Sequence, residues 1–353
     1  MIDASEMAEI EKTQFPALEV EQKVAQEMSE QHQASQSHPQ AGSQVEGRPS
    51  GTQPMQHGHR PASAEQVPAT LVPVGGWHFL HMFYRVDRAA LSQLPKGQRA
   101  AAMAQLAAAM SPAVGEDKPI TQMHTFAVVG HKADFGFVAS GPDIRALNGV
   151  QMAMEASDLG PALVPTYSFY SITEISEYVP TAEQYGQTLL REGLDPESDM
   201  FKTKVRTYEQ RLVPMNKQRL LPEFPDWPSL CFYPMSKTRV PDANWYSEPF
   251  SRRSEMMAQH GKSGMKFAGK VIQVVTSSTG LDDWEWGVTL WGKNPSYLKD
   301  IVYTMRFDES SAKFGLFGDF YFGYRLPPEE LLKELQLEKQ GADTPILKSI
   351  GLI

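Results

Sequence analysis

One short segment carries three side chains that could do chemistry together. It spans residues 229–237 and contains Tyr233, Met235 and Lys237. Alternate side chains of a β-strand lie on one face, so a strand here would point an oxidisable phenol, a soft thioether and a cation the same way. A buried ammonium group needs an anionic partner, and no acidic residue occurs in this segment. The pattern indicates a ligand that carries carboxylates.

A lone histidine follows in the next predicted helix. This helix is expected over about 248–260 and should end at Gly261. Its apolar stripe runs through Phe250 and Met257 to His260, which places the imidazole near the buried face. Neutral imidazole is a common iron ligand, although a single histidine more often serves as a hydrogen-bonded core or cap residue. Together with the tyrosine and the lysine, it suits a redox cofactor that carries carboxylates.

Three further polar residues are candidates for the same site. Gln273 lies in an apolar strand predicted over 270–277, where its amide must be hydrogen-bonded or meet a ligand. This amide can donate or accept a hydrogen bond, but it supplies no charge. Arg219 and Ser311 are unremarkable by spacing alone, and surface exposure explains both equally well.

The elements that must position these residues form a repeated pattern. In the first half, strands are predicted at 77–86, 122–130, 133–140 and 165–173, with helices at 88–110 and 143–156. In the second half, strands are predicted at 230–235, 270–277, 284–291 and 317–326, with helices at 248–260 and 295–305. Each half has the order β-α-β-β-α-β of a ferredoxin-like unit. The expected fold is therefore α+β, with duplicated ferredoxin-like units, antiparallel sheets and helices outside, packed into one barrel-like body.

The same pattern divides the chain into four segments. Residues 1–70 are rich in Gln, Ser, His, Pro and Gly and are expected to form a disordered, low-complexity tail. Residues 71–180 form the N-terminal unit, and residues 181–228 form a linker with a helix near 181–192. Residues 229–340 form the C-terminal unit, which holds the candidate site and ends in a helix at about 327–339.

Composition and charge exclude several classes of protein. The net charge is −9, of which the first 66 residues carry −6, so the body is nearly neutral and lacks the excess of basic residues that nucleic-acid binding needs. No apolar run is long enough to cross a membrane, and the acidic N-terminus does not fit a secretory signal. The single cysteine, Cys231, excludes an internal disulfide and favours a reducing, cytoplasmic location.

Several long motifs together resemble one family. They are Phe-Tyr-Pro-Met-Ser-Lys (232–237), Asn-Trp-Tyr-Ser-Glu-Pro-Phe (244–250), Met-Met-Ala-Gln-His-Gly (256–261), Gly-Leu-Asp-Asp-Trp-Glu-Trp-Gly-Val (280–288) and Met-Arg-Phe-Asp-Glu-Ser-Ser-Ala (305–312). Over about 75–326 the chain is similar to the chlorite dismutase-like haem proteins, and specifically to their coproheme decarboxylase branch. The family fold is a duplicated ferredoxin-like barrel, usually assembled as a homopentamer.

The resemblance assigns roles to residues. His260 would be the proximal ligand of the haem iron, and Tyr233 the redox-active, catalytic tyrosine. The residues implied in binding coproheme are Arg219, Tyr233, Pro234, Met235, Ser236, Lys237, Gln273 and Ser311. Gln273 falls where this branch places a distal glutamine, whereas chlorite dismutases are expected to carry an arginine there. The long tail and residues 180–228 depart from the family pattern, so Arg219 is the weakest of these assignments.

The activity that the resemblance implies is oxidative decarboxylation. Hydrogen peroxide would convert two propionates of Fe-coproporphyrin III (coproheme) to vinyl groups and give haem b, through a radical on Tyr233. A coproporphyrin ferrochelatase would supply the substrate. Two other functions stay open on sequence: chlorite dismutase or haem peroxidase activity, and haem carriage without catalysis.

Overall fold

The computed structural model describes residues 69–337. The predicted tail lies outside these residues, apart from its last two positions, and so do residues 338–340 of the predicted C-terminal unit. None of the helices described is long and apolar enough to cross a membrane.

The first half of the described chain forms a four-stranded antiparallel sheet. Its strands are β1 (His78–Val86), β2 (Gln122–Val128), β3 (Phe135–Gly141) and β4 (Leu163–Ile172), in the order β2-β3-β1-β4. Its helices are α3 (Arg88–Gln93), α4 (Lys96–Ala109) and α5 (Ile144–Glu155). The helix predicted over 88–110 is therefore two helices, because Pro95 takes an extended conformation between them. The side chain of Asp87 caps α3, and that of Asp143 caps α5.

The second half repeats this arrangement. Its strands are β5 (Ser229–Lys237), β8 (Val271–Ser277), β9 (Trp286–Gly292) and β11 (Tyr321–Arg325), in the order β11-β5-β9-β8. Numbered within each half, both sheets have the same strand order. The main helices are α8 (Phe250–Met265) and α9 (Pro295–Met305), and the side chain of Asn294 caps α9. The α+β fold with an antiparallel sheet and outer helices is confirmed.

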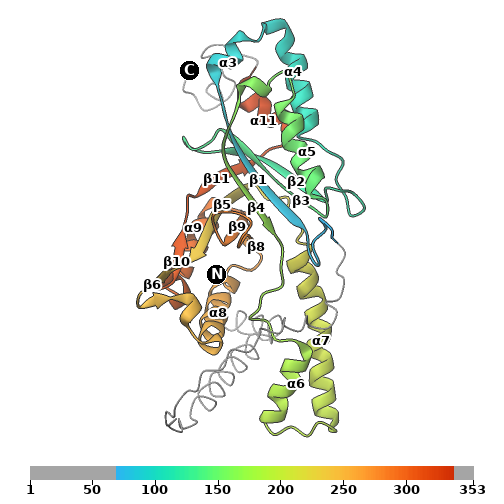
Figure 1. Ribbon diagram of the computed structural model, residues 1–353, viewed down its shortest axis with the longest axis vertical. Coiled ribbons are helices and arrows are strands. Elements are labelled where there is room, and N and C mark those ends of the chain that lie inside the picture. Colours follow the sequence, from blue (N-terminus) through green and yellow to red (C-terminus); the bar gives the residue numbers. More distant parts are fainter. Residues whose placement is uncertain (1–68, 338–353) are drawn as a thin grey trace, which may run out of the picture.

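The two sheets join into one closed barrel (Figure 1). β11 pairs with β2 on one side, and β4 meets β8 on the other through the single pair Ile172 and Ser277. The interior is filled by aromatic side chains rather than by a cavity. Its buried members include Phe79, Phe83, Phe126, Phe169, Phe232 and Trp291.

Three boundaries differ from the prediction. α8 does not end at Gly261 but continues to Met265, so His260 lies inside the helix rather than at its end. The strand predicted over 317–326 is two strands, β10 (Gly315–Phe317) and β11, which share one edge of β5. The strand is interrupted between them at Gly318, whose N–H donates a hydrogen bond to the carbonyl of Pro234. The last described helix is α11 (Pro328–Glu334).

The segment between the halves is a helical hairpin that projects from the barrel (Figure 1). α6 (Ala182–Arg191) is the helix predicted near 181–192, and Thr181 and Gln184 form its capping box. α7 (Asp199–Leu220) was not predicted. The two helices pack through Tyr185, Leu189 and Tyr208. Smaller elements are β6 (Arg239–Val240), β7 (Ala243–Asn244) and α10 (Glu309–Ala312).

Candidate functional site

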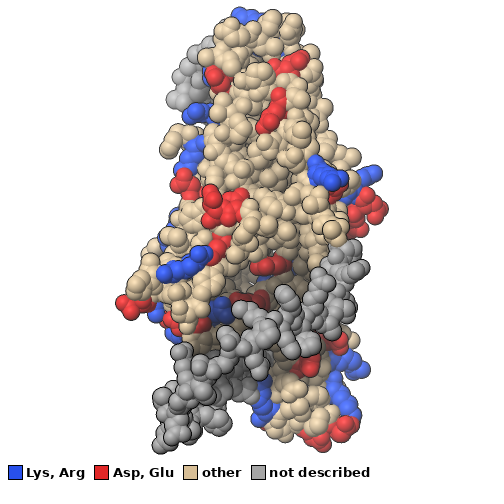
Figure 2. Space-filling view, in the orientation of Figure 1, with Lys and Arg blue, Asp and Glu red and all other residues tan. Residues whose placement is uncertain are grey.

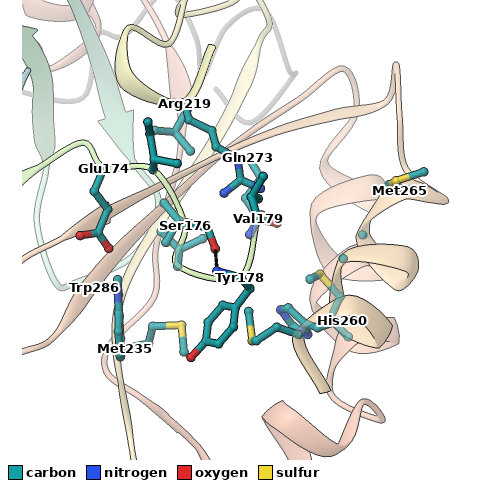
Figure 3. A pocket seen from close by; sticks show the side chains of 18 of the residues that line it. Glu174, Ser176, Tyr178, Val179, Arg219, Met235, His260, Met265, Gln273 and Trp286 are labelled. Atoms are coloured by element: carbon teal, nitrogen blue, oxygen red, sulfur yellow. Dashed lines mark hydrogen bonds between the residues drawn. The ribbon is translucent and has the colours of Figure 1, made fainter. Parts of the chain in front are cut away.

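A cavity of about 1120 Å³ lies between the sheet of the second half, α8 and the loop that follows β4 (Figure 3). This volume is slightly larger than that of typical ligand pockets, which reach about 1,000 Å³. The side chains predicted to share one face of β5, Tyr233, Met235 and Lys237, all line it. It is also lined by four other predicted site residues: Arg219, His260, Gln273 and Ser311.

Two predicted binding residues, Pro234 and Ser236, do not line this cavity. They occupy the opposite face of β5, as strand alternation requires. The hydroxyl of Ser236 accepts a hydrogen bond from the backbone N–H of Glu285 at 3.1 Å. Both side chains are buried on the far side of the strand, so direct contact with a ligand in this cavity does not fit their position.

His260 is held by a carboxylate that the sequence analysis missed. Its Nδ1 lies 3.1 Å from Oδ2 of Asp308, and the other carboxylate oxygen accepts a hydrogen bond from Ser263 at 2.7 Å. Asp308 is buried, whereas the imidazole keeps 23% of its side-chain surface exposed. Asp308 stands 48 residues after His260 in sequence. Only its place in the 305–312 motif could have pointed to it.

This contact selects one tautomer of the imidazole. With Nδ1–H donating to Asp308, Nε2 keeps a free lone pair. Burial and the nearby Lys237 ammonium lower the pKa of His260, while Asp308 acts in the opposite direction. A neutral imidazole with a carboxylate behind it is a typical arrangement for a metal ligand.

Lys237 brings a poorly compensated positive charge to the cavity wall. Its ammonium donates to the carbonyl of Ser310 at 2.7 Å and lies 4.3 Å from the ring centre of Trp245. Among residues 69–337, no carboxylate lies within ion-pair distance of it. Burial lowers the pKa of Lys237 to about 8, although Glu285 acts to raise it.

Glu285 fixes the end of β5 where Lys237 stands. Its buried carboxylate accepts from the backbone N–H of Lys237 at 2.8 Å and from the hydroxyl of Tyr246 at 2.6 Å. It also pairs with the guanidinium of Arg239. These contacts occupy the carboxylate and leave the Lys237 ammonium turned toward the cavity.

Tyr233 has an ordered ring and an unengaged hydroxyl. The ring stacks on Phe320 with centroids 4.4 Å apart, and it is 8% exposed. Within the described part of the chain, burial and nearby charges act on its hydroxyl, and no hydrogen bond to it is found. Burial raises its pKa, so the phenol keeps its proton at neutral pH. Oxidation of this residue must therefore release a proton together with an electron.

The remaining predicted residues take different positions around the cavity. Gln273 on β8 is exposed toward it, and Arg219 stands in the last turn of α7 (Figure 3). The hydroxyl of Ser311 lies 3.4 Å from Nδ1 of His260, so it belongs to the histidine side of the site. On sequence, the amide of Gln273 had to be hydrogen-bonded or meet a ligand. Its side chain is exposed at the cavity, so it needs no partner from the protein.

The cavity is also lined by positively charged residues that the sequence analysis did not select. The full set is Lys217, Arg219, Lys237, Arg253 and Arg306. Three acidic residues, Glu174, Glu177 and Glu223, line the cavity as well, so cations outnumber acids by five to three. On the face shown in Figure 2, positive and negative side chains are interspersed. Several cations around one neutral imidazole suit a planar metal complex with carboxylates at its edge, so the side chains present fit an iron porphyrin bearing propionates.

Comparison with known proteins places the chain in a family. Residues 99–326 match the family described as chlorite dismutase. A coproheme decarboxylase of Staphylococcus carnosus is 36% identical over 257 residues, which cover 72% of this chain and 94% of that protein.

Two archaeal relatives are longer, and their names describe them as candidate haem-binding proteins. The one from Halobacterium salinarum is 40% identical over 72% of this chain, and the one from Natronomonas pharaonis is 37% identical over 76%. The chain spans less than half of their length, 49% and 42% respectively.

Solved structures agree with the fold. A structure from Thermus thermophilus, titled as a novel heme-binding protein, superposes with a TM-score of 0.61 at 36% identity and covers 75% of this chain and 96% of that one. A chlorite dismutase from Candidatus Nitrospira defluvii superposes at 0.55 with 16% identity over 76% of this chain and 97% of that one, which supports the fold alone. The chain belongs to the chlorite dismutase family.

Proposed function

We propose that this protein is a coproheme decarboxylase, an oxidoreductase that uses hydrogen peroxide to convert two propionates of Fe-coproporphyrin III to vinyl groups and so forms haem b. Each propionate loses one CO2, one proton and two electrons, and one hydrogen peroxide accepts those electrons. The relatives from Staphylococcus that carry this name match the chain over nearly their whole length, which supports the proposal.

One observation carries the proposal: Tyr233, Lys237 and His260 line the same cavity. An oxidisable phenol, a cation for a carboxylate and a neutral imidazole for iron are the three groups that this chemistry needs. They come from strand β5 and helix α8, which both line the cavity.

The bound iron supplies the redox centre that reduces peroxide. The chain supplies position, charge and a hydrogen-atom carrier. Asp308 orients the His260 ring, so that Nε2 can hold the metal. Lys237 fixes a propionate by its charge, in a wall that excludes water from one side. Tyr233 gives up its phenolic hydrogen and recovers one from the β-carbon of a propionate. The resulting propionate radical then loses CO2 and one further electron to leave a vinyl group, and peroxide is the final acceptor of both electrons.

The decisive experiment is anaerobic reconstitution with ferric coproporphyrin III, followed by peroxide titration and mass spectrometry of the porphyrin. We expect a product that has lost one carboxyl group, followed by haem b, with two peroxides consumed for each haem b. Bound coproheme that survives peroxide unchanged would instead identify a haem carrier.

The family also contains chlorite dismutases, so chlorite is the second substrate to test. Gln273 presents a neutral amide to the cavity, at the position where an oxyanion-holding arginine is expected in those enzymes. We therefore expect no oxygen evolution when the haem-loaded protein is mixed with chlorite. Rapid oxygen release would show that the protein is a chlorite dismutase and would contradict the proposed decarboxylase function.

The proposal extends to the setting of the enzyme. It includes a homopentamer in the cytoplasm that receives coproheme from a coproporphyrin ferrochelatase. Light scattering on the purified protein should give five times the 39.4 kDa mass of the chain. A mass of one or two chains would remove the pentamer from the proposal.

A further inference from the structure

Arg253 shares a helix face with the proposed iron ligand. It precedes His260 by seven residues on α8, and Met257 lies between them. Residues spaced by seven positions lie on the same side of an α-helix, about 10 Å apart along its axis. All three side chains line the cavity. If His260 marks the centre of a bound macrocycle, Arg253 stands near its edge.

The guanidinium of Arg253 has unused hydrogen-bonding capacity. Its side chain is 18% exposed, and its Nε is buried without a hydrogen-bond partner. The central carbon of the group lies 5.6 Å from the ring centre of Phe250, which holds the side chain in place. A planar guanidinium with a free edge matches a carboxylate, which can accept two parallel hydrogen bonds from it. Buried donors rarely remain unpaired, so this edge points to a missing acceptor.

The acid beside Arg253 is a weak partner. Oε1 of Glu177 lies 3.5 Å from Nη1, which is beyond a normal hydrogen bond, and the Glu177 side chain is 56% exposed. Water screens such a pair, so little is lost when it is broken. Glu177 belongs to the irregular loop after β4, whose neighbouring Tyr178 stacks on Phe250 with centroids 5.8 Å apart. The loop thus places a carboxylate where a ligand carboxylate could take over.

We propose that Arg253 is a carboxylate-binding residue of this cavity, and that its guanidinium exchanges Glu177 for a propionate of the bound porphyrin. The inference rests on the proposed function for the identity of the ligand. Glu177 is then a competitor that occupies the site in the free protein and is displaced when the ligand binds.

Exchange predicts opposite effects for the two partners. Removing the charge of Arg253 removes a ligand contact and should weaken binding about tenfold. Removing the charge of Glu177 removes a competitor and should tighten binding about two- to threefold. A purely structural ion pair would instead make both substitutions harmful or both neutral.

The test is a titration with metal-free coproporphyrin III, in which binding is measured by the quenching of tryptophan fluorescence. Without iron, neither ligation by His260 nor turnover contributes to the signal. Arg253→Gln and Glu177→Gln are compared with the unsubstituted protein, and Arg253→Lys keeps the charge but loses the planar fork. We expect Arg253→Lys to bind with an affinity between those of the unsubstituted protein and Arg253→Gln.

Matched controls lie on the same helix. Arg252 pairs with Glu255 and Glu309, and neither Arg252 nor Glu255 lines the cavity. Arg252→Gln and Glu255→Gln should therefore bind within twofold of the unsubstituted protein. The tetramethyl ester of the porphyrin, which has no carboxylate, should not distinguish Arg253→Gln from the unsubstituted protein.

The outcomes separate the two proposals. If the unsubstituted protein binds the porphyrin and Arg253→Gln binds it equally well, the role of Arg253 is overturned and the proposed function stands. If Glu177→Gln weakens binding as Arg253→Gln does, exchange is overturned. If the unsubstituted protein binds neither metal-free nor ferric coproporphyrin, the proposed function itself fails.

Discussion

The two halves of the barrel have the same strand order, yet their helices pack on their sheets differently within residues 69–337, and a cavity opens between sheet and helix in the second half. In the first half, helix and strand residues form one continuous apolar core, in which Ala102 and Leu106 of α4 meet Met82 and Phe137 of the sheet. In the second half, α9 packs on the sheet in this way through Leu298 and Ile301.

α8 behaves differently from α4 and α9. Its apolar residues Met256 and Met257 pack with Trp245 and Phe314, outside the cluster that joins α9 to the strands. The cavity-facing positions of α8 are mixed: Arg253 and His260 are polar, Gly261 and Gly264 are small, and Met257 and Met265 are apolar. The site therefore lies between the sheet and a helix whose buried apolar residue Met256 packs with Trp245 and Phe314.

Two stacked tyrosines test this difference most strongly. Tyr233 stacks on Phe320 in the second half, and Tyr84 stacks on Phe135 in the first, with centroids 5.3 Å apart. Tyr233→Phe should keep coproheme binding but lower haem b formation about 100-fold or more, because the ring remains without an oxidisable hydroxyl. Tyr84→Phe should leave turnover unchanged. Equal turnover by both variants, measured by mass spectrometry after peroxide, would remove Tyr233 from the chemistry.

Truncation of one side chain in each half should separate packing from function. Leu106→Ala on α4 empties a fully buried position and should lower the free energy of unfolding by about 2–5 kcal/mol. Met257→Ala on α8 borders a space that already exists and should cost about 1 kcal/mol or less. Urea unfolding measures both. A larger loss for Met257→Ala would mean that α8 stabilises the fold as much as α4 does.

The carboxylate behind His260 should matter for iron more than for the fold. Asp308→Asn removes the charge that orients the ring, and we expect coproheme affinity to fall about 10- to 100-fold with a shifted absorption spectrum. Ser263→Ala removes the other contact of Asp308 and should have a smaller effect. An unchanged spectrum in Asp308→Asn would argue against His260 as the ligand.

The smallest expected effect is a pH dependence of porphyrin binding, which follows from a difference between the buried cations of the two halves. Arg99 on α4 donates to the carbonyls of Leu91 and Leu94, whereas Lys237 keeps a pKa of about 8 beside the cavity. A carboxylate binds the protonated amine, so affinity for metal-free coproporphyrin should be retained below pH 8 and fall up to about tenfold per pH unit above it. Lys237→Met should bind more weakly and lose this dependence. The same slope in Lys237→Met would assign the titration to another group.

Much of the fold could be predicted because local signals agreed with the tertiary structure. The order β-α-β-β-α-β, the caps at Asp143 and Asn294, and the shared face of Tyr233, Met235 and Lys237 follow from periodicity and capping. α7 could not be predicted, because its sequence is polar and carries Pro214 inside the helix. Its 22 residues are held by a small cluster with α6, which local propensity does not reveal.

The candidate site was predictable only where one element carried the information. The extension of α8 beyond Gly261 depends on packing, since Gly264 lies against Met305 of α9. Asp308 and Arg253 escaped notice because their significance comes from partners on other elements, His260 and Glu177 respectively. Pro234 and Ser236 were predicted to bind the ligand because they belong to the 232–237 motif. That prediction did not take into account that side chains alternate along a strand, which directs these two away from the cavity.

The position of β5 has a consequence for how this sequence can vary. One face of the strand carries Phe232 into the aromatic interior, and the other carries Tyr233 and Lys237 to the cavity. Its two edges pair with β9 and with β10 and β11. Both faces and both edges of the strand are in use, so a saturation scan should find few tolerated substitutions along 230–237. Substitutions at interior-facing positions should reduce the yield of soluble protein, and those at cavity-facing positions should reduce product formation. A single-residue insertion there should abolish both at once, because it exchanges the two faces.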